Sequence, residues 1–295
     1  MPSIPMPLLE SLKKDRCILF AGSGLSIAAG YPSWSELVDL LVKEAAAAYP
    51  EKAASLTGYA ANNKDPLMIA EFARGKLGLQ RCAMHLRQVF DRRLPPSPVH
   101  KLIAATNYRA IITTNYDKLL ETAITFERGW FPTVFTSESV SLLGTVLYEG
   151  HFFVYELHGD VAAAESIVLT SQDYDRLILR YPHVRSFLQA IFLNYAVLFV
   201  GYSLHDPDFQ LVLKELRLIF ECYTPTQYAL LPDAHEFTAE HLMARMNIQV
   251  IPYSSADGHG GVNEFLRSLQ QAAPYREAIP VTATSVSQTP AVSGV

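Results

Sequence analysis

The sequence predicts an α/β fold, in which a parallel sheet carries helices on both faces and a small helical module is inserted. Short apolar runs of strand length alternate with segments whose apolar residues recur at helical spacing, which is typical of parallel strands joined by crossover helices. Residues 50–98, in contrast, contain amphipathic helix patterns and no convincing strand. We therefore expect a main domain over 1–49 and 99–274, and a helical insert over 50–98.

The composition is that of a folded, globular chain. It has 295 residues, of which 49% are apolar and 18% charged, enough for a sizeable core, and this excludes a disordered protein and a coiled coil. The net charge of −5, without a basic run, disfavours direct binding to nucleic acid or to an anionic membrane. Residues 275–295 are rich in Ser, Thr, Ala, Val and Pro without a period, so we expect a disordered tail there.

The cysteines and the longest apolar run indicate a cytoplasmic protein. Cys17, Cys82 and Cys222 lie far apart, and their spacing matches neither a metal site nor a disulfide framework. The N-terminus lacks the basic start and apolar core of a signal peptide. Residues 186–204 carry no charge, but they contain amide side chains and a glycine. We interpret them as a buried helix that runs into a buried strand, and we expect no membrane span.

The first third of the chain begins with a helix at about 7–14. The apolar run CILFAG at 17–22 is typical of a strand buried on both faces. Ser33 and Glu36 have capping-box spacing and predict the helix that follows. Within the helical insert, DPLMIAEFARG offers a capping Asp with Pro at the first helical position, and LQRCAMHLRQVF is amphipathic.

The strand pattern returns at residues 109–115, after the helix opened by SPVHKLIAATN. Further strands are expected at 151–159, 166–170, 197–201, 227–231 and 248–253. Helices are expected at 117–126, 171–180, 187–195, 206–220 and 260–272. Strands and helices that alternate at this spacing predict a parallel sheet.

A glycine-rich loop follows the first expected strand. Gly22, Ser23 and Gly24 end the strand, and a loop of small residues continues through Ser26. In dinucleotide-binding folds such glycines let the backbone approach a pyrophosphate, and the amides that follow donate hydrogen bonds to it. The full G-x-G-x-x-G pattern is not present, because Ile27 occupies the third glycine position. A plain glycine-rich turn therefore remains an alternative.

Three further motifs place polar residues at strand ends, the edge at which open α/β sheets bind ligands. Asp117 lies where it would cap the next helix, whereas neither a strand end nor a cap requires Asn115. His158 ends an apolar strand beside a glycine and is a candidate general base, although a lone histidine is more often structural. Gly201 and Ser203 end another strand, where a tight turn followed by a helix cap is the alternative.

Together, and in this order, the motifs G-S-G, T-T-N-x-D, L-H-G and G-x-S-L-x-D-P resemble the sirtuin family, and more closely its bacterial sirtuin-like branch. The resemblance runs from about 17 to 270 and implies a Rossmann-like, NAD-binding fold. It implies that Asn115 positions the nicotinamide ribose and a water, and that His158 is the catalytic histidine. The residues implied to bind NAD are Gly22, Ser23, Gly24, Ser26, Thr114, Asp117, Gly201 and Ser203.

The sequence departs from the sirtuin deacylases in two places. Residues 30–35, GYPSWS, lack the Asp and Arg of the deacylase motif G-I-P-D-F-R. No cysteine lies between Asp117 and His158, where deacylases carry their four-cysteine zinc module. We therefore expect no zinc. These departures argue against an acyl-lysine channel, but they do not affect the residues of the NAD-cleaving core.

The resemblance implies an NAD glycohydrolase that cleaves NAD to nicotinamide and ADP-ribose, as an anti-phage defence effector that depletes NAD. The alternatives are an NAD-dependent protein deacylase or ADP-ribosyltransferase, which would use the same site, and a non-catalytic NAD or ADP-ribose sensor. A dehydrogenase is the weakest alternative. We also expect the activity to be gated, through a homo-oligomer or an activating partner protein such as an ATPase or a short Argonaute.

Overall fold

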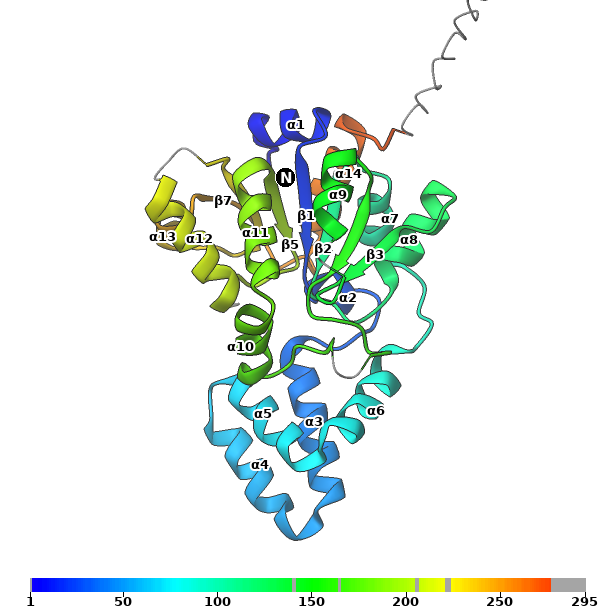
Figure 1. Cartoon of the computed structure of the whole chain (residues 1–295), viewed down its shortest axis with the longest axis vertical. Helices are drawn as coiled ribbons and strands as arrows, with labels where there is room; N and C mark the ends of the chain where they lie inside the picture. The colour runs from blue at the N-terminus through cyan, green and yellow to red at the C-terminus, as the bar shows by residue number, and fades with distance from the viewer. Residues whose placement is uncertain (1, 140–141, 164–165, 205–206, 221–223, 277–295) are drawn as a thin grey trace, which may run out of the picture.

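The computed structural model describes residues 2–139, 142–163, 166–204, 207–220 and 224–276 (Figure 1). Its centre is a seven-stranded sheet in which every neighbouring pair of strands is parallel. Helices cover both faces of this sheet. The predicted α/β fold with a Rossmann-like parallel sheet is therefore confirmed.

The strands are β1 (Cys17–Ala21), β2 (Ala110–Thr113), β3 (Thr133–Thr136), β4 (Phe153–Glu156), β5 (Ala196–Val200), β6 (Gln227–Pro232) and β7 (Ile248–Tyr253). Their order in the sheet is β3-β4-β2-β1-β5-β6-β7. The helices of the first half are α1 (Met6–Lys13), α2 (Gly24–Ile27), α3 (Trp34–Ala48), α4 (Ala53–Asn62), α5 (Pro66–Leu77), α6 (Leu79–Phe90), α7 (Pro98–Ala104) and α8 (Leu119–Arg128). The later ones are α9 (Leu143–Glu149), α10 (Ser171–Arg180), α11 (Pro182–Asn194), α12 (Pro207–Phe220), α13 (Glu236–Met246) and α14 (Gly260–Ala272).

Strand β1 lies at the centre of the sheet and is buried along its whole length. Ile18 and Phe20 belong to the apolar cluster on one face of the sheet. Cys17, Leu19 and Ala21 belong to the cluster on the other face. A strand that feeds two cores must be apolar at every position, which explains why CILFA shows no polar alternation.

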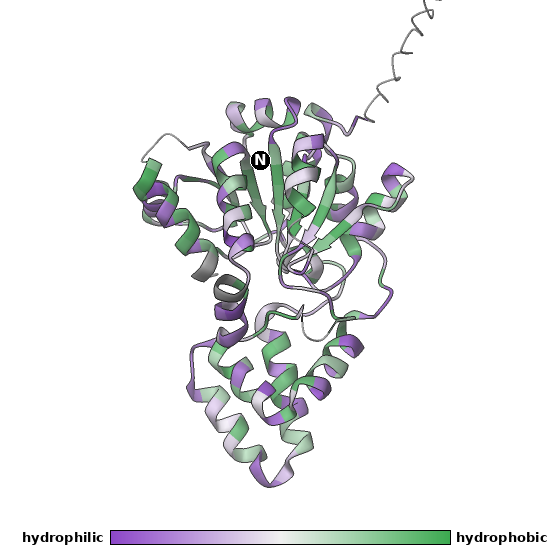
Figure 2. Cartoon of the chain, in the orientation of Figure 1, coloured by the Kyte–Doolittle hydropathy of each residue, from purple (hydrophilic) through white to green (hydrophobic). Residues whose placement is uncertain are grey.

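The two faces of the sheet are covered by different helices. Helices α9, α10, α11, α12 and α13 contribute to the cluster on one face. Helices α1, α7, α8 and α14 contribute to the cluster on the other. Figure 2 shows that the central strands are largely hydrophobic, whereas the helices mix hydrophobic and hydrophilic residues. No helix within the described residues is long and apolar enough to cross a membrane.

A third apolar cluster holds together what we call the helical layer, α3 to α6, which lies beyond the carboxyl ends of the strands (Figure 1). Helix α3 packs against α4, α5 and α6, although the sequence assigned it to the main domain. The cluster also includes Tyr116, Leu119 and Leu169, which follow β2 or β4. The layer is therefore packed directly on the loops at that edge of the sheet. The predicted domain limits themselves stay a prediction.

The strand expected at 166–170 is wrong, because no strand forms there. Ile167, Val168 and Leu169 are buried, but they lie between the helical layer and the sheet rather than in the sheet. The apolar run reflects burial of these residues and not their pairing in a sheet. The sequence alone does not distinguish a buried loop from a buried strand. The elements that were not individually anticipated are β3, α2, α4, α9 and α13, of which α4 lies within the expected helical insert. The expected tail at 275–295, apart from its first two residues, lies outside the described residues, as does Cys222.

Candidate active site

The strand order reverses between β1 and β5. From β1 the chain first builds outward through β2, β3 and β4 on one side, and then crosses to β5 on the other. Strands β1 and β5 are therefore neighbours at the point where the strand order reverses, which is the place where open α/β sheets bind their ligands. Gly22 to Ser26 leave β1 here, and Gly201 to Ser203 leave β5.

The glycines of these two loops pack backbone against backbone. The Gly22 amide donates to the Val200 carbonyl (3.0 Å), and the Gly24 amide donates to the Gly201 carbonyl (2.9 Å). A Cβ atom on Gly24 would lie 2.9 Å from the Cα of Gly201, so no side chain fits. The glycines thus join the β1 and β5 loops into one unit. Their two amides are already bonded, so pyrophosphate binding by this loop stays a prediction.

A chain of hydrogen bonds joins the β1 loop to the segment after β2. The Asn115 Nδ2 donates to the Gly22 carbonyl (3.1 Å) and to the Ser26 Oγ (3.0 Å). The Ser26 hydroxyl in turn donates to Asp117 Oδ2 (2.6 Å). The amide of Leu119 donates to Asp117 Oδ1 (3.1 Å), but the N-cap of α8 is Lys118, so Asp117 stands one residue before the capping position that its alternative explanation assigned to it. Four residues singled out by the sequence, Gly22, Ser26, Asn115 and Asp117, are therefore brought together.

This chain fixes the orientation of the Asn115 side chain. The Gly22 carbonyl can only accept a hydrogen bond, so the amide nitrogen must face it. Both hydrogens of that nitrogen are used, and the Asn115 Oδ1 is left buried without a hydrogen-bond partner in the described part of the chain. An oriented, buried acceptor without a partner is costly for folding alone and points to a ligand.

Asp117 is almost completely buried. Burial raises the pKa of its carboxyl above the usual value, and the hydrogen bond from Ser26 opposes that rise. Because its two oxygens are occupied by Ser26 and Leu119, Asp117 contributes mainly by holding Ser26, and through it Asn115, in place. Direct contact between Asp117 and a nicotinamide amide stays a prediction.

His158 lies at the same edge of the sheet as Asn115. Thr113 of β2 pairs with Glu156 of β4, so Asn115 and His158 each stand two residues beyond a paired position on adjacent strands. The His158 ring is buried and meets the ring of Tyr174 edge to face, with centroids 5.2 Å apart. The sequence did not reveal Tyr174, because nothing in an amphipathic helix marks one ring as a partner of a residue in a preceding loop.

The remaining predicted site residues border this group. The Thr114 amide donates to the Ala21 carbonyl (3.2 Å), which ties the end of β2 to that of β1. Ser23 is half-buried in the β1 loop, and Ser203 is exposed after β5. The structure therefore places all the predicted residues at the carboxyl edge, and it links Gly22, Ser26, Asn115 and Asp117 by direct hydrogen bonds.

A buried pair of carboxyl groups lies beside this site and was not found from the sequence. Glu121 of α8 and Glu156 of β4 are both about 2% exposed. Lys118 bonds to Glu156 and also to Asp160 (3.1 Å). Burial raises the pKa of Glu121 well above its ordinary value, and the neighbouring Glu156 raises it further. Glu121 therefore keeps its proton at pH values where an exposed glutamate is charged.

We expect Glu121→Gln to change how stability depends on pH. The unfolded chain loses this proton near pH 4.5 while the folded chain keeps it, so stability falls as the pH rises toward the folded pKa. Glutamine has no proton to lose. Relative to wild type, the variant should gain up to about 1.4 kcal/mol of unfolding free energy per pH unit above 4.5. Urea unfolding at pH 5, 6 and 7 measures this gain.

Glu127→Gln, an exposed position on the same helix, is the matched control and should keep a constant difference from wild type. A difference for Glu121→Gln that does not change with pH would show that Glu121 is already charged in the folded protein.

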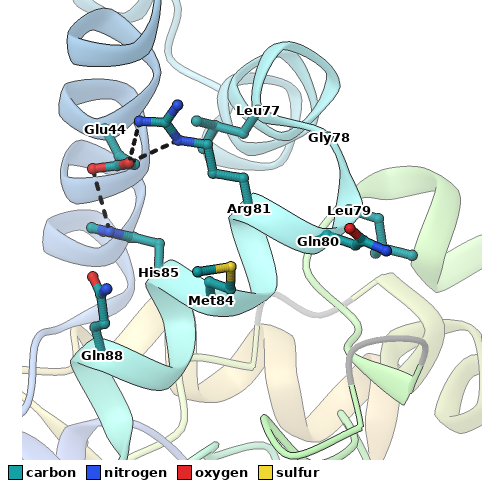
Figure 3. Close-up of a pocket in the computed structure, with 9 residues that line it drawn as sticks. All are labelled: Glu44, Leu77, Gly78, Leu79, Gln80, Arg81, Met84, His85 and Gln88. Carbon is teal, nitrogen blue, oxygen red and sulfur yellow. Dashed lines mark hydrogen bonds and ion pairs between the residues drawn. The ribbon is translucent and has the colours of Figure 1, made fainter.

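Two pockets are lined mainly by the helical layer and contain none of the predicted site residues. The larger has a volume of 870 Å³ and lies between α3 and α6, lined by Glu44, Leu77, Gly78, Leu79, Gln80, Arg81, Met84, His85 and Gln88. Figure 3 shows Arg81 and His85 both directed at Glu44 across this pocket. The second, of 630 Å³, shares Gly78 and Leu79 with it. Among the described residues, no group of three or more His, Cys, Asp and Glu could hold a metal ion.

Residues 109–251 match the family model described as a SIR2-like domain, a range that includes Asn115, Asp117, His158 and Gly201. The chain is 26% identical over 251 residues to NAD(+) hydrolase ThsA of Bacillus cereus (strain MSX-D12), an alignment that covers 81% of this chain and 49% of that protein.

It is 24% identical over 309 residues to NAD(+) hydrolase ThsA of Enterococcus faecium, covering 96% of this chain and 61% of that protein. It is also 27% identical over 213 residues to Defense-associated sirtuin 2 of Bacillus subtilis, covering 71% of this chain and 20% of that protein. The chain thus spans only part of the length of the curated proteins that it resembles.

Proposed function

Since this chain is a sirtuin-like protein, as its motifs predicted and its SIR2-like domain confirms, we propose that it is an NAD glycohydrolase that cleaves NAD to nicotinamide and ADP-ribose. Several relatives that align with this chain are named NAD(+) hydrolases. The positions of the two proposed catalytic residues, Asn115 and His158, support the proposal, because each follows one of two adjacent strands at the ligand edge of the sheet.

The observation that carries the proposal is the Oδ1 of Asn115, which has no hydrogen-bond partner among the residues that the structure describes. Its orientation is set before any substrate arrives, because Gly22 and Ser26 hold the amide nitrogen. A fixed acceptor in a buried place can take a hydrogen bond from a ribose hydroxyl or from a water without reorganisation. A residue that only filled the core at this position would need no amide group.

In the proposed reaction, the oxygen of a water bonds to C1′ of the nicotinamide ribose. The bond from C1′ to the ring nitrogen breaks, and its electron pair stays with nicotinamide, which leaves as a neutral molecule. Asn115 orients the ribose and the water, and His158 accepts the proton that the water releases. Nicotinamide needs little help from an acid, so one base and a well-oriented water suffice.

The test of this function is to incubate the purified chain with NAD and to identify the products by mass spectrometry. Nicotinamide and ADP-ribose in equal amounts are the expected products. A panel of nucleotides is added in parallel, because a gated enzyme is silent until it is activated. Unchanged NAD under every condition, together with tight NAD binding, would instead favour the sensor alternative.

The same site would serve a protein deacylase or an ADP-ribosyltransferase, which replace water with another nucleophile. We expect an acetyl-lysine peptide incubated with NAD to yield no free lysine above background, and metal analysis to find no stoichiometric zinc. The absence of the Asp and Arg of the deacylase motif at residues 30–35 supports this expectation. Robust deacylation would replace hydrolysis as the proposed activity.

Anti-phage defence by NAD depletion is the proposed role of this activity. Its support is that the relatives include a protein named Defense-associated sirtuin 2. An uncontrolled NAD hydrolase would poison its own cell, so we propose gating through a homo-oligomer or an activating partner. Light scattering over a concentration series, with NAD turnover measured on the same samples, tests it. A strict monomer with high activity at every concentration would refute the gating.

A further inference from the structure

We propose that Arg74 and Arg87 of the helical layer are positioning residues that hold His158 in place. The proposal rests on the function proposed above and adds a mechanical role for the layer. The stretch that follows His158, described at 159–163 and 166–170, forms no strand, and among these residues only Ser166 is helical, in a 3-10 turn. Two arginines of the helical layer bond to it instead, one near each end.

Arg87 holds the beginning of this stretch. Its Nε donates to the Val161 carbonyl (2.7 Å), and its Nη2 donates to the Ala162 carbonyl. Guanidinium is a planar fork, so two bonds to successive carbonyls fix both the position and the direction of the backbone. These carbonyls lie only three and four residues beyond His158, and α6 therefore controls where the stretch leaves the sheet.

Arg74 holds the far end of the same stretch. Its side chain pairs with Asp173, and its Nη2 donates to the Thr170 Oγ1 (2.9 Å). The Asp173 side chain is 3% exposed and the Arg74 side chain 17%, so this pair is largely shielded from water. Thr170 and Asp173 also form the capping box of α10. Arg74 of α5 therefore binds the first turn of α10 and holds it in place.

Both the backbone and the ring of His158 contact residues near the far end of this stretch. Tyr174, which follows Asp173 on α10, packs its ring against the His158 ring at 5.2 Å between centroids. The Val168 amide donates to the His158 carbonyl (3.0 Å), and the Val168 carbonyl accepts from the buried hydroxyl of Tyr116. A displacement of α5 or α6 would thus reach His158 through its backbone and its ring together.

The geometry supplies a route by which the helical layer can set the activity of the site. Errors of about 1 Å in the placement of a catalytic group can cost roughly 100-fold in rate. Because Arg74 and Arg87 touch neither Asn115 nor the glycine loops, their loss should spare NAD binding. Loss of these contacts should therefore lower kcat and leave KM almost unchanged.

The experiment compares Arg74→Ala, Arg87→Ala and the double variant with Arg81→Ala. Arg81 is the matched control, because it lies on α6 but bonds to Glu44 within the layer (Figure 3). We expect kcat to fall about 10- to 100-fold in each single variant, with KM within threefold, and kcat to be unchanged in Arg81→Ala. Arg87→Lys, which keeps one donor, should recover part of the rate and guards against a variant that fails to fold.

Hydrogen exchange over residues 158–163 and 166–170 gives a second readout that needs no activity. Exchange should accelerate in both arginine variants and not in Arg81→Ala. If the wild type hydrolyses no NAD, the proposed function fails while this exchange still decides whether the arginines hold the stretch. Unchanged exchange in the double variant, or a double variant with wild-type kcat, overturns the inference.

Discussion

Replacement of Asn115 or His158 by alanine should lower NAD turnover by roughly 100-fold or more, which is the size of effect expected for a general base or an oriented acceptor. Asn115→Ala removes the group that presents the fixed acceptor, and it also removes the hydrogen bonds that the side-chain amide donates to the Gly22 carbonyl and to Ser26. His158→Ala removes the proposed base. Steady-state kcat, measured on the activated protein, is the quantity to compare.

The matched controls are Asn107→Ala and His151→Ala. The Asn107 amide bonds to the Leu12 carbonyl (3.0 Å), and His151 stands two residues before β4, at the opposite end from His158. Both controls should keep turnover within twofold of wild type. Thermal unfolding of all four variants separates loss of the fold from loss of chemistry. Wild-type turnover in folded Asn115→Ala and His158→Ala would falsify the site.

Gly159→Ala should disrupt both the fold around His158 and the turnover. Gly159 has φ of +80°, and a Cβ atom there would lie 2.1 Å from the Ser166 carbonyl oxygen. That atom belongs to the backbone and cannot swing aside, so the stretch after His158 must move. We expect a cost of about 1–2 kcal/mol for the left-handed backbone and about 1–3 kcal/mol more for the forced contact.

Gly129→Ala separates these two costs. Gly129 has φ of +77°, but a Cβ atom there would meet nothing within 4 Å, so only the backbone cost applies. Chemical denaturation gives the two losses of stability, and kcat gives the effect on the site. Equal losses for the two variants would mean that the contact with Ser166 relaxes at no cost. Undiminished kcat in Gly159→Ala would show that His158 does not depend on this turn.

The central part of the fold could be predicted because its signals are local. The run CILFA is apolar at each position, and β7 and α14 begin and end where their patterns do. Strand β3 was missed because it is a four-residue edge strand, in which burial enforces little pattern. Helix α13 was missed because only Leu242 and Met246 are buried along it, which gives weak helical periodicity.

The identity of the site residues was accessible from the sequence, but their connections were not. Asn115 stood out because no turn or cap required it. The bond from Ser26 to Asp117 joins residues 91 apart and exists only because β1 and β2 pair in register. In the sequence pattern, the arginines of the helical layer look like ordinary surface residues of amphipathic helices. Only their placement over the stretch after His158 gives them a role.

The position of β1 between β2 and β5 also bears on when the site can form. Cys17 to Ala21 pair with Ala196 to Val200, and Gly24 closes against Gly201. A ribosome releases the first of these segments long before the second, so the central strand of a growing polypeptide lacks one whole row of partners. The contact between Gly24 and Gly201 cannot form until residue 201 has emerged from the ribosome. A chain whose translation stops earlier therefore carries Asn115 and His158 but lacks the β5 side of the candidate site.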